Sequence, residues 1–179
     1  MISLNVIFWM YVGFFGLIGA MRGWARELLV SFSVILSLFV VAVMERFVPF
    51  IRDNLMVNSP DSYFWLRSII LVTLVFFGYQ TPNFPRVANS GRFIRDKFQD
   101  VLLGLFIGAV NGYLVFGSLW SFLDQAGYPF SFIIPPDMNT ELGIAAQKLL
   151  VYMPPELLGT PVIYFAVAIA FVFVLVIFL

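Results

Sequence analysis

The sequence predicts an all-α polytopic integral membrane protein, with about five transmembrane helices and a short interfacial amphipathic helix. Of the 179 residues, 61% are hydrophobic and 11% are charged, whereas a soluble domain is about 45–50% apolar and about 25% charged. The mean hydropathy is +0.98. A spanning helix needs about 20 apolar residues, so the chain has room for four or five spans with short loops.

The composition also excludes several classes of function. The chain contains no Cys and no His, which rules out a disulfide scaffold, a Ser-His-Asp triad and a zinc site built on thiolates or imidazoles. Ten Lys and Arg balance ten Asp and Glu, so no basic excess indicates a nucleic-acid partner. We therefore expect no catalytic residues, no metal and no cofactor.

The first two spans are predicted at about 4–21 and 28–44, and neither carries a charge. No Lys or Arg precedes the first span and no A-x-A-like site follows it, so it is predicted to be a retained helix rather than a signal peptide.

The third span is predicted at about 64–79, with Arg67 near its start, and the fourth at about 101–123. The fifth, at 162–179, would extend over about 27 Å. It has no polar anchor at its end, and we expect that a polar tail follows.

The predicted spans place the loops alternately on two faces. One face carries the N-terminus and the loops at 45–63 and 124–161, and its basic residues are Arg46, Arg52, Arg67 and Lys148. The other face carries the connections at 22–27 and 80–100, and its basic residues are Arg22, Arg26, Arg86, Arg92, Arg95 and Lys97. The second face thus carries six basic residues and the first carries four. Because short loops rich in Lys and Arg lie on the cytoplasmic side, the second face is predicted to be cytoplasmic and the N-terminus to lie outside.

An amphipathic helix is predicted at about 139–153. Its apolar residues recur at helical spacing, and they are Leu142, Ala145, Ala146, Leu149, Leu150 and Met153. Paired prolines precede it and end it. The helix either lies flat on the outer face of the membrane or packs on neighbouring spans, and both interpretations carry equal weight. The stretch 47–55 is too short and too charged to span.

Small residues form stripes on two spans. Gly104, Gly108 and Gly112 share one face of the fourth span, and a second stripe on the first span consists of Gly13, Gly16 and Ala20, with Gly19 and Gly23 beside it. Small residues let helix backbones approach closely in lipid. Packing between these two spans is the favoured interpretation, and an interface with another subunit is the alternative.

Asn111 is the most deeply placed polar side chain in the predicted spans. An amide in hydrocarbon requires a partner, and such inter-helix bonds contribute about 0.6–2 kcal/mol. We expect a structural hydrogen bond, with a residue on a substrate path as the alternative. No Asp, Glu, Lys or Arg is predicted at mid-span, which argues against an ion-coupled transporter.

Charged residues flank two spans at the predicted cytoplasmic face. Arg22, Arg26 and Glu27 precede the second span, and Asp96 and Asp100 precede the fourth. One hypothesis pairs Arg22 or Arg26 with Asp100 and so joins two hairpins. The alternative is separate anchoring by arginines that reach the interface. Asp100 is also placed to cap the fourth span, and Glu27 is an acidic residue at a helix N-terminus.

Two motifs resemble the CvpA (colicin V production protein) family. Residues 19–27 read G-x-x-R-G-x-x-R-E, and residues 100–112 resemble the family's D-R-x-L-G-x-x-x-G-x-x-x-G stretch. The chain departs from the second pattern at Val101, where the family has Arg, and at Asn111, where a basic residue is frequent.

The resemblance covers about residues 1–123 and implies a CvpA-like four-helix membrane domain. The region 124–161 would then be an extracytoplasmic loop, and 162–179 an additional C-terminal transmembrane helix. Members of the family are multi-pass proteins of the bacterial inner membrane, linked to colicin V export and envelope homeostasis, so the resemblance implies that location.

The function expected from these features is a non-catalytic membrane scaffold or accessory subunit of a larger complex, for example a respiratory or photosynthetic one. Its partners would be the lipid bilayer and other membrane-protein subunits or further copies of itself. The alternatives are a CvpA-like envelope or secretion factor and a small transporter component.

Overall fold

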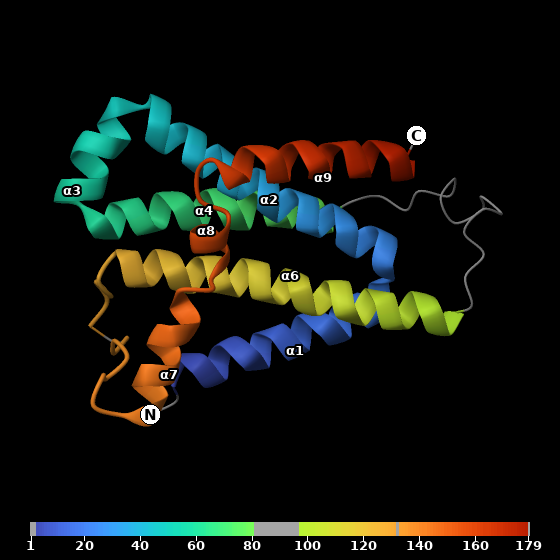
Figure 1. The fold of residues 1–179 in the computed structure, drawn as a ribbon, viewed down its shortest axis with the longest axis horizontal. Coiled ribbons are helices and arrows are strands. Elements are labelled where there is room, and N and C mark those ends of the chain that lie inside the picture. The colour runs from blue at the N-terminus through green and yellow to red at the C-terminus, as the bar shows by residue number, and fades with distance from the viewer. Residues whose placement is uncertain (1–2, 81–96, 132, 179) are drawn as a thin grey trace.

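Long helices run back and forth along one axis of the molecule (Figure 1). The computed structural model describes residues 3–80, 97–131 and 133–178. Four of its helices are long and apolar enough to cross a membrane, namely α1 (Leu4–Arg22), α2 (Trp24–Phe47), α4 (Pro60–Tyr79) and α6 (Lys97–Gln125). The prediction of an all-α membrane protein is confirmed.

The C-terminal region forms α7 (Glu141–Leu150), α8 (Pro154–Leu157) and α9 (Val162–Phe178). The segments Glu141–Leu157 and Val162–Val176 are apolar enough to form one further span when taken together, with a bend of 62° between them. The structure thus has four or five candidate spans. α9 begins part-way along the bundle rather than at its end (Figure 1), because the buried Ile163 packs with α2 and α4 and the Tyr164 ring lies 5.9 Å from that of Phe39.

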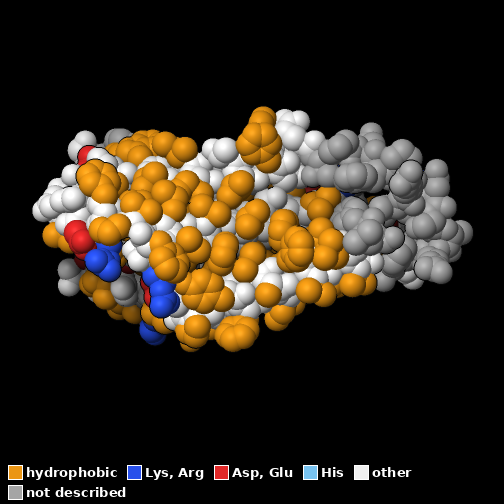
Figure 2. Space-filling model, turned by 90° about the horizontal axis from the view of Figure 1, so that it is seen from above, with side chains coloured by type: hydrophobic (Ala, Val, Ile, Leu, Met, Phe, Trp, Pro, Cys, Tyr) orange, Lys and Arg blue, Asp and Glu red, His pale blue; other side chains and the backbone are white. Residues whose placement is uncertain are grey.

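The connection between α2 and α4 is a π-helical turn, η1 (Ile51–Leu55), followed by the short α3 (Met56–Asn58). Arg52 Nε donates to Asp53 Oδ1 over 2.8 Å, and this bond lowers the pKa of the exposed Asp53. Figure 2 shows charged side chains gathered at this end of the molecule, while apolar side chains cover the length of the coloured bundle. This is the surface expected of a helix bundle in a bilayer.

The core lies where α2, α4 and α6 meet. Val30, Val34, Leu71, Val115 and Phe122 are all buried in one cluster. On α2 the buried residues of this cluster recur every fourth position from Val30 to Leu38, which places them on one face of the helix. α6 contacts α1, α2 and α4 and is therefore the helix around which the bundle is organised.

α1 and α6 pack against each other, as the glycine stripes predicted. Gly19, Gly104 and Gly108 form the closest approach, because a Cβ built on Gly19 would collide with the carbonyl oxygen of Gly104 and lie 2.7 Å from Gly108 Cα. Gly16 and Gly112 also lie at this contact. The glycines therefore form a contact between two helices of the same chain.

The predicted stripe on α1 requires a correction. A Cβ on Gly13 would meet nothing within 4 Å, and Ala20 is only partly buried. The buried line on α1 runs instead through Phe8, Gly16 and Gly19 and reaches Gly23. Steps of eight, three and four residues keep these positions on one face of the helix, whereas Gly13 lies off it.

α7 packs on the bundle rather than standing apart from it. Ala146 and Leu150 are buried against Phe8 of α1 and Trp120 of α6, together with Met153. Of the predicted apolar stripe, Leu142 and Ala145 are exposed and do not pack on the bundle, whereas Gly143 is buried. A Cβ on Gly143 would collide with the backbone of Asp137, so the loop before α7 packs directly on that position. The buried face of α7 therefore runs through Gly143, Ala146 and Leu150.

The long helices extend beyond the predicted spans, and α2 covers Trp24–Phe47 rather than 28–44. α4 begins at Pro60 rather than near Phe64, with proline in its first turn, and α6 is already helical at Lys97, the first residue described after the gap, rather than from about Val101. Proline is favoured in the first turn because no N–H is needed there. The predicted site residue Asp96 lies outside the described residues.

Candidate functional site: a buried polar network

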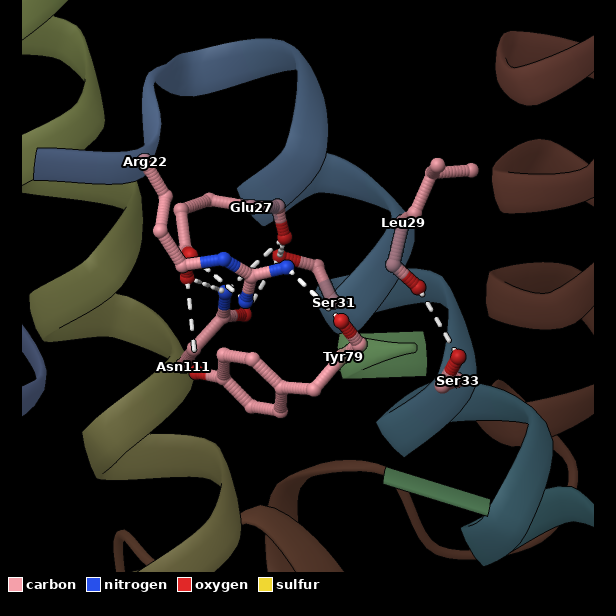
Figure 3. A network of polar contacts seen from close by, with 7 residues as sticks. All are labelled: Arg22, Glu27, Leu29, Ser31, Ser33, Tyr79 and Asn111. Carbon is pink, nitrogen blue, oxygen red and sulfur yellow. Dashed lines mark hydrogen bonds and ion pairs between the residues drawn. The ribbon is translucent and has the colours of Figure 1, made fainter. Parts of the chain in front are cut away.

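Five polar side chains meet where the α1–α2 turn, α4 and α6 come together. They form what we call the Glu27 network (Figure 3), and its members are Arg22, Glu27, Ser31, Tyr79 and Asn111. Glu27 and Asn111 are fully buried. The network joins residues that are far apart in the sequence.

The Glu27 carboxylate is the centre of the network. Arg22 Nη1 lies 3.2 Å from its Oε1, while Asn111 Nδ2 donates to Oε2 over 2.8 Å and Tyr79 Oη donates to the same oxygen over 3.5 Å. A buried carboxylate is tolerated when it is paired with a cation and hydrogen-bonded. Both oxygens of Glu27 meet this condition.

Asn111 forms the predicted structural hydrogen bond, and its amide is fully used. Nδ2 also donates to the Glu27 main-chain carbonyl over 2.8 Å, and Oδ1 accepts from Ser31 Oγ over 2.6 Å. Helix α6 is thereby bonded to α2 within the apolar bundle, where the alternative is an unsatisfied amide.

Arg22 extends the network to α4. Its Nη2 donates to the Tyr79 carbonyl oxygen over 3.1 Å, and its guanidinium carbon lies 4.3 Å from the centre of the Tyr79 ring. A cation over an aromatic face is attracted to it. Arg22 therefore ties α1 to the end of α4.

The hypothesis that Arg22 pairs with Asp100 is wrong, because its guanidinium is held by Glu27. Asp100 also does not cap α6, since that helix begins at Lys97. Its Oδ1 instead accepts from the Trp24 main-chain N–H over 3.3 Å. Asp100 thus accepts from a main-chain N–H at the start of α2, where helices lack an internal partner, and it joins α6 to the α1–α2 turn. The alternative pairing of Arg26 with Asp100 stays a prediction.

Gly23 makes this arrangement possible. Its backbone angles are φ 86° and ψ 155°, a region that is essentially restricted to glycine. A Cβ here would also lie 2.9 Å from Asp100 Oδ2. The one-residue turn between α1 and α2 therefore requires glycine for both its conformation and its contact.

Replacing Gly23 with alanine is expected to destabilise the fold by about 1–3 kcal/mol, because alanine would be strained at these angles and would displace Asp100. The midpoint of thermal unfolding in detergent, followed by tryptophan fluorescence, measures the effect. Gly13→Ala is the control, because its Cβ meets nothing. Equal midpoints for the two variants would contradict the role given to Gly23.

A second polar cluster lies at the opposite end of the bundle. Arg67 is only 3% exposed; it donates to Gln125 Oε1 and the Phe122 carbonyl oxygen and lies over the Tyr63 ring. Tyr63 Oη donates to Glu45, and Gln125 donates to Glu156 over 3.0 Å. Arg67, expected close to the start of its span, lies about 10 Å into α4 because that helix begins at Pro60.

Sequence reasoning missed the convergence of these groups. Glu27 was predicted to interact with a helix end, whereas it is the centre of the network. Ser31, one turn after Glu27, and Tyr79, at the end of its span, could have been found as polar residues next to the predicted charges. Gln125 and Tyr63 could have identified the Arg67 cluster only if the start of α4 had been placed at Pro60.

The two clusters are separated by packed apolar side chains. Val30, Val34 and Leu71 are completely buried between them, and the intervening Ser37 and Ser118 donate to carbonyls of their own helices. Within the described residues, no group of three or more Asp and Glu is placed to hold a metal ion. The arrangement is suited to holding helices together.

In comparisons with known proteins, no family model, no curated protein and no solved structure matches the chain.

Proposed function

We propose that the chain is a non-catalytic membrane scaffold that serves as an accessory subunit of a larger membrane complex. The observation that carries this proposal is the surface of α9. This helix offers a long apolar face that the other described residues leave uncovered. A helix of another protein that packs on this face would add to the bundle in the same way as α9 packs on α2.

The uncovered face of α9 has a regular pattern. Phe165, Ile169, Val172 and Val176 are between 58% and 75% exposed and are spaced by four, three and four residues. This spacing places them on one side of the helix and is the spacing at which two packed helices interdigitate. The buried attachment of α9 lies at its first turn, with Ile163.

The use of polar residues supports the same proposal. The Glu27 network and the Arg67 cluster consist of groups that bond to one another across helices. Transporters and pumps use intramembrane charges to bind or relay ions, whereas these charges hold helices in place. A bundle that offers an uncovered apolar helix face is what a scaffold requires.

Site-specific photo-crosslinking in the native membrane tests the proposal. A benzophenone amino acid at Phe165 or Ile169 is expected to form one protein adduct of defined mass. The matched control places it at Leu17 of α1, which is 62% exposed and lies outside the proposed interface on α9. That position is expected to react with lipid alone.

A failure of α9 to form any protein adduct would contradict the scaffold proposal. Identical adducts at α9 and at Leu17 would also contradict the proposal, because they would report random collision.

A second candidate is a CvpA-like envelope or secretion factor in a bacterial inner membrane. The observation in its favour is that the residues on which the resemblance rests converge in space. Arg22 and Glu27 pair with each other, and Asp100 contacts the turn that follows Arg22. Motif residues that meet at one site are what a shared family structure would produce.

Deletion in the organism of origin distinguishes the two candidates. Loss of a larger complex with normal envelope integrity favours the scaffold. Sensitivity to bile salts or detergent with intact membrane complexes favours the envelope factor, and restoration by the wild-type gene but not by a Glu27→Leu variant would connect that phenotype to the motif residues.

A further inference from the structure

Two adjoining cavities lie between the start of α1, α6, α7 and the loop before α7. The larger is about 540 Å³ and is bounded by α1, the segment 133–137 and α7; the smaller is about 200 Å³ and lies between α1, α4 and α6. Leu4 and Ile7 line both. The two cavities therefore adjoin at these side chains, and together we call them the α1–α7 slot.

The inner part of the slot is lined entirely by apolar side chains. They include Phe8, Phe64, Phe116 and Trp120. Trp120 is held in place, because its Nε1 donates to Tyr128 Oη over 3.2 Å and its ring centre lies 5.7 Å from that of Phe8. Covering apolar surface with an apolar group is favourable, so the slot favours a hydrocarbon occupant.

The outer part of the slot has polar groups at its edge. Ser3, Asp137 and Thr140 line it, and no Lys or Arg is among its lining residues. The hydrogen bonds that the structure gives the Asp137 carboxylate come from Asn139 and use Oδ1. Among the described residues that line the slot, Asp137 is the charged one, and a carboxylate attracts a cation and repels an anion.

The larger part of the slot measures about 540 Å³. A flexible hydrocarbon chain fits a narrow slot, and the volume lies in the range of about 300–1,000 Å³ typical of small-molecule sites.

We propose that the α1–α7 slot binds one acyl chain of a phospholipid with an ammonium head group, such as phosphatidylethanolamine. The chain lies along Leu4, Ile7, Phe116 and Trp120, and the ammonium lies beside Asp137. The start of α1 and α7, which line the outer part of the slot, lie at the same end of the bundle (Figure 1), so the head group is placed at that membrane surface.

Photo-crosslinking in lipid vesicles tests this proposal. The full chain is reconstituted in vesicles of equal parts phosphatidylethanolamine and phosphatidylglycerol, with a trace of either lipid carrying a diazirine near the end of one acyl chain. Peptide mapping is expected to find the phosphatidylethanolamine adducts concentrated at residues 4–8 and 116–123. The phosphatidylglycerol probe is expected to label these residues several-fold less.

Two pairs of variants make the test specific. Ile7→Trp fills the slot and is expected to reduce labelling of 116–123 several-fold, whereas Val6→Trp, at an adjacent position that is 54% exposed, leaves it unchanged. Asp137→Asn is expected to reduce the preference for phosphatidylethanolamine by about two- to fivefold, as for an exposed ion pair, while Glu141→Gln retains it.

Labelling spread evenly over exposed residues such as Phe106 and Phe165 would overturn the proposal, because it would show only the surrounding bilayer. Equal labelling of the slot by both lipids would overturn the assignment of the ammonium head group. The mapping on the wild-type chain decides both points even if a variant fails to fold.

Discussion

Replacing Gly19 with valine is expected to prevent α1 from packing on α6 and to cost about 3 kcal/mol or more, at the upper end of the range for overpacked cores. The obstacle is backbone, since a Cβ at this position collides with the carbonyl oxygen of Gly104 and lies 2.7 Å from Gly108 Cα. A side-chain rotation cannot relieve such a contact. In a chain of this size the loss corresponds to a fall of roughly 6–12 °C in the midpoint of thermal unfolding.

Gly13→Val is the matched control for this prediction. It places the same side chain on the same helix, at an exposed position where a Cβ meets nothing within 4 Å. Its midpoint is expected to stay within about 2 °C of the wild type, as for a surface substitution. Similar losses in both variants would show that valine itself, rather than the glycine contact, is responsible.

Replacing Glu27 with leucine is expected to cost about 3 kcal/mol, near the lower end of the range for breaking a buried ion pair. The substitution leaves the Asn111 amide and the Arg22 guanidinium without their carboxylate partner. The side chain of Arg22 is 19% exposed and can turn toward water, which keeps the loss at the lower end. Thermal unfolding in detergent measures it.

The control for Glu27 is Glu141→Leu, which removes an exposed acidic residue from the first turn of α7 and is expected to cost no more than about 1 kcal/mol. Arg22→Met combined with Glu27→Leu is expected to lose less than the sum of the two single losses, since the residues are in contact. Strict additivity would show that the pair does not interact.

Composition and glycine spacing were sufficient to predict much of the fold. Hydrophobic segments locate α1, α2, α4 and α6 because a bilayer requires long apolar helices. The spacing of Gly104 and Gly108 predicted contact with α1 because close backbone approach in lipid requires small residues. The start of α4 and the buried face of α7 could not be predicted, because each depends on a local proline or on a loop that covers one side.

The polar site was only partly predictable. The bond of Asn111 follows from the cost of an unpaired amide in hydrocarbon, but its partner does not. Glu27 lies in the first turn of its helix, where either a surface position or a buried one fits the sequence. Only the tight turn at Gly23, which brings Arg22 and Asp100 to the start of α2, decides between them.

The most direct test of the scaffold proposal is native mass spectrometry of the protein extracted from its own membrane in mild detergent. The account predicts a complex of defined stoichiometry that contains other membrane subunits, and an Ile169→Arg substitution on the exposed face of α9 should release the chain from it. A wild-type chain found alone, or only with copies of itself, would contradict a role as an accessory subunit.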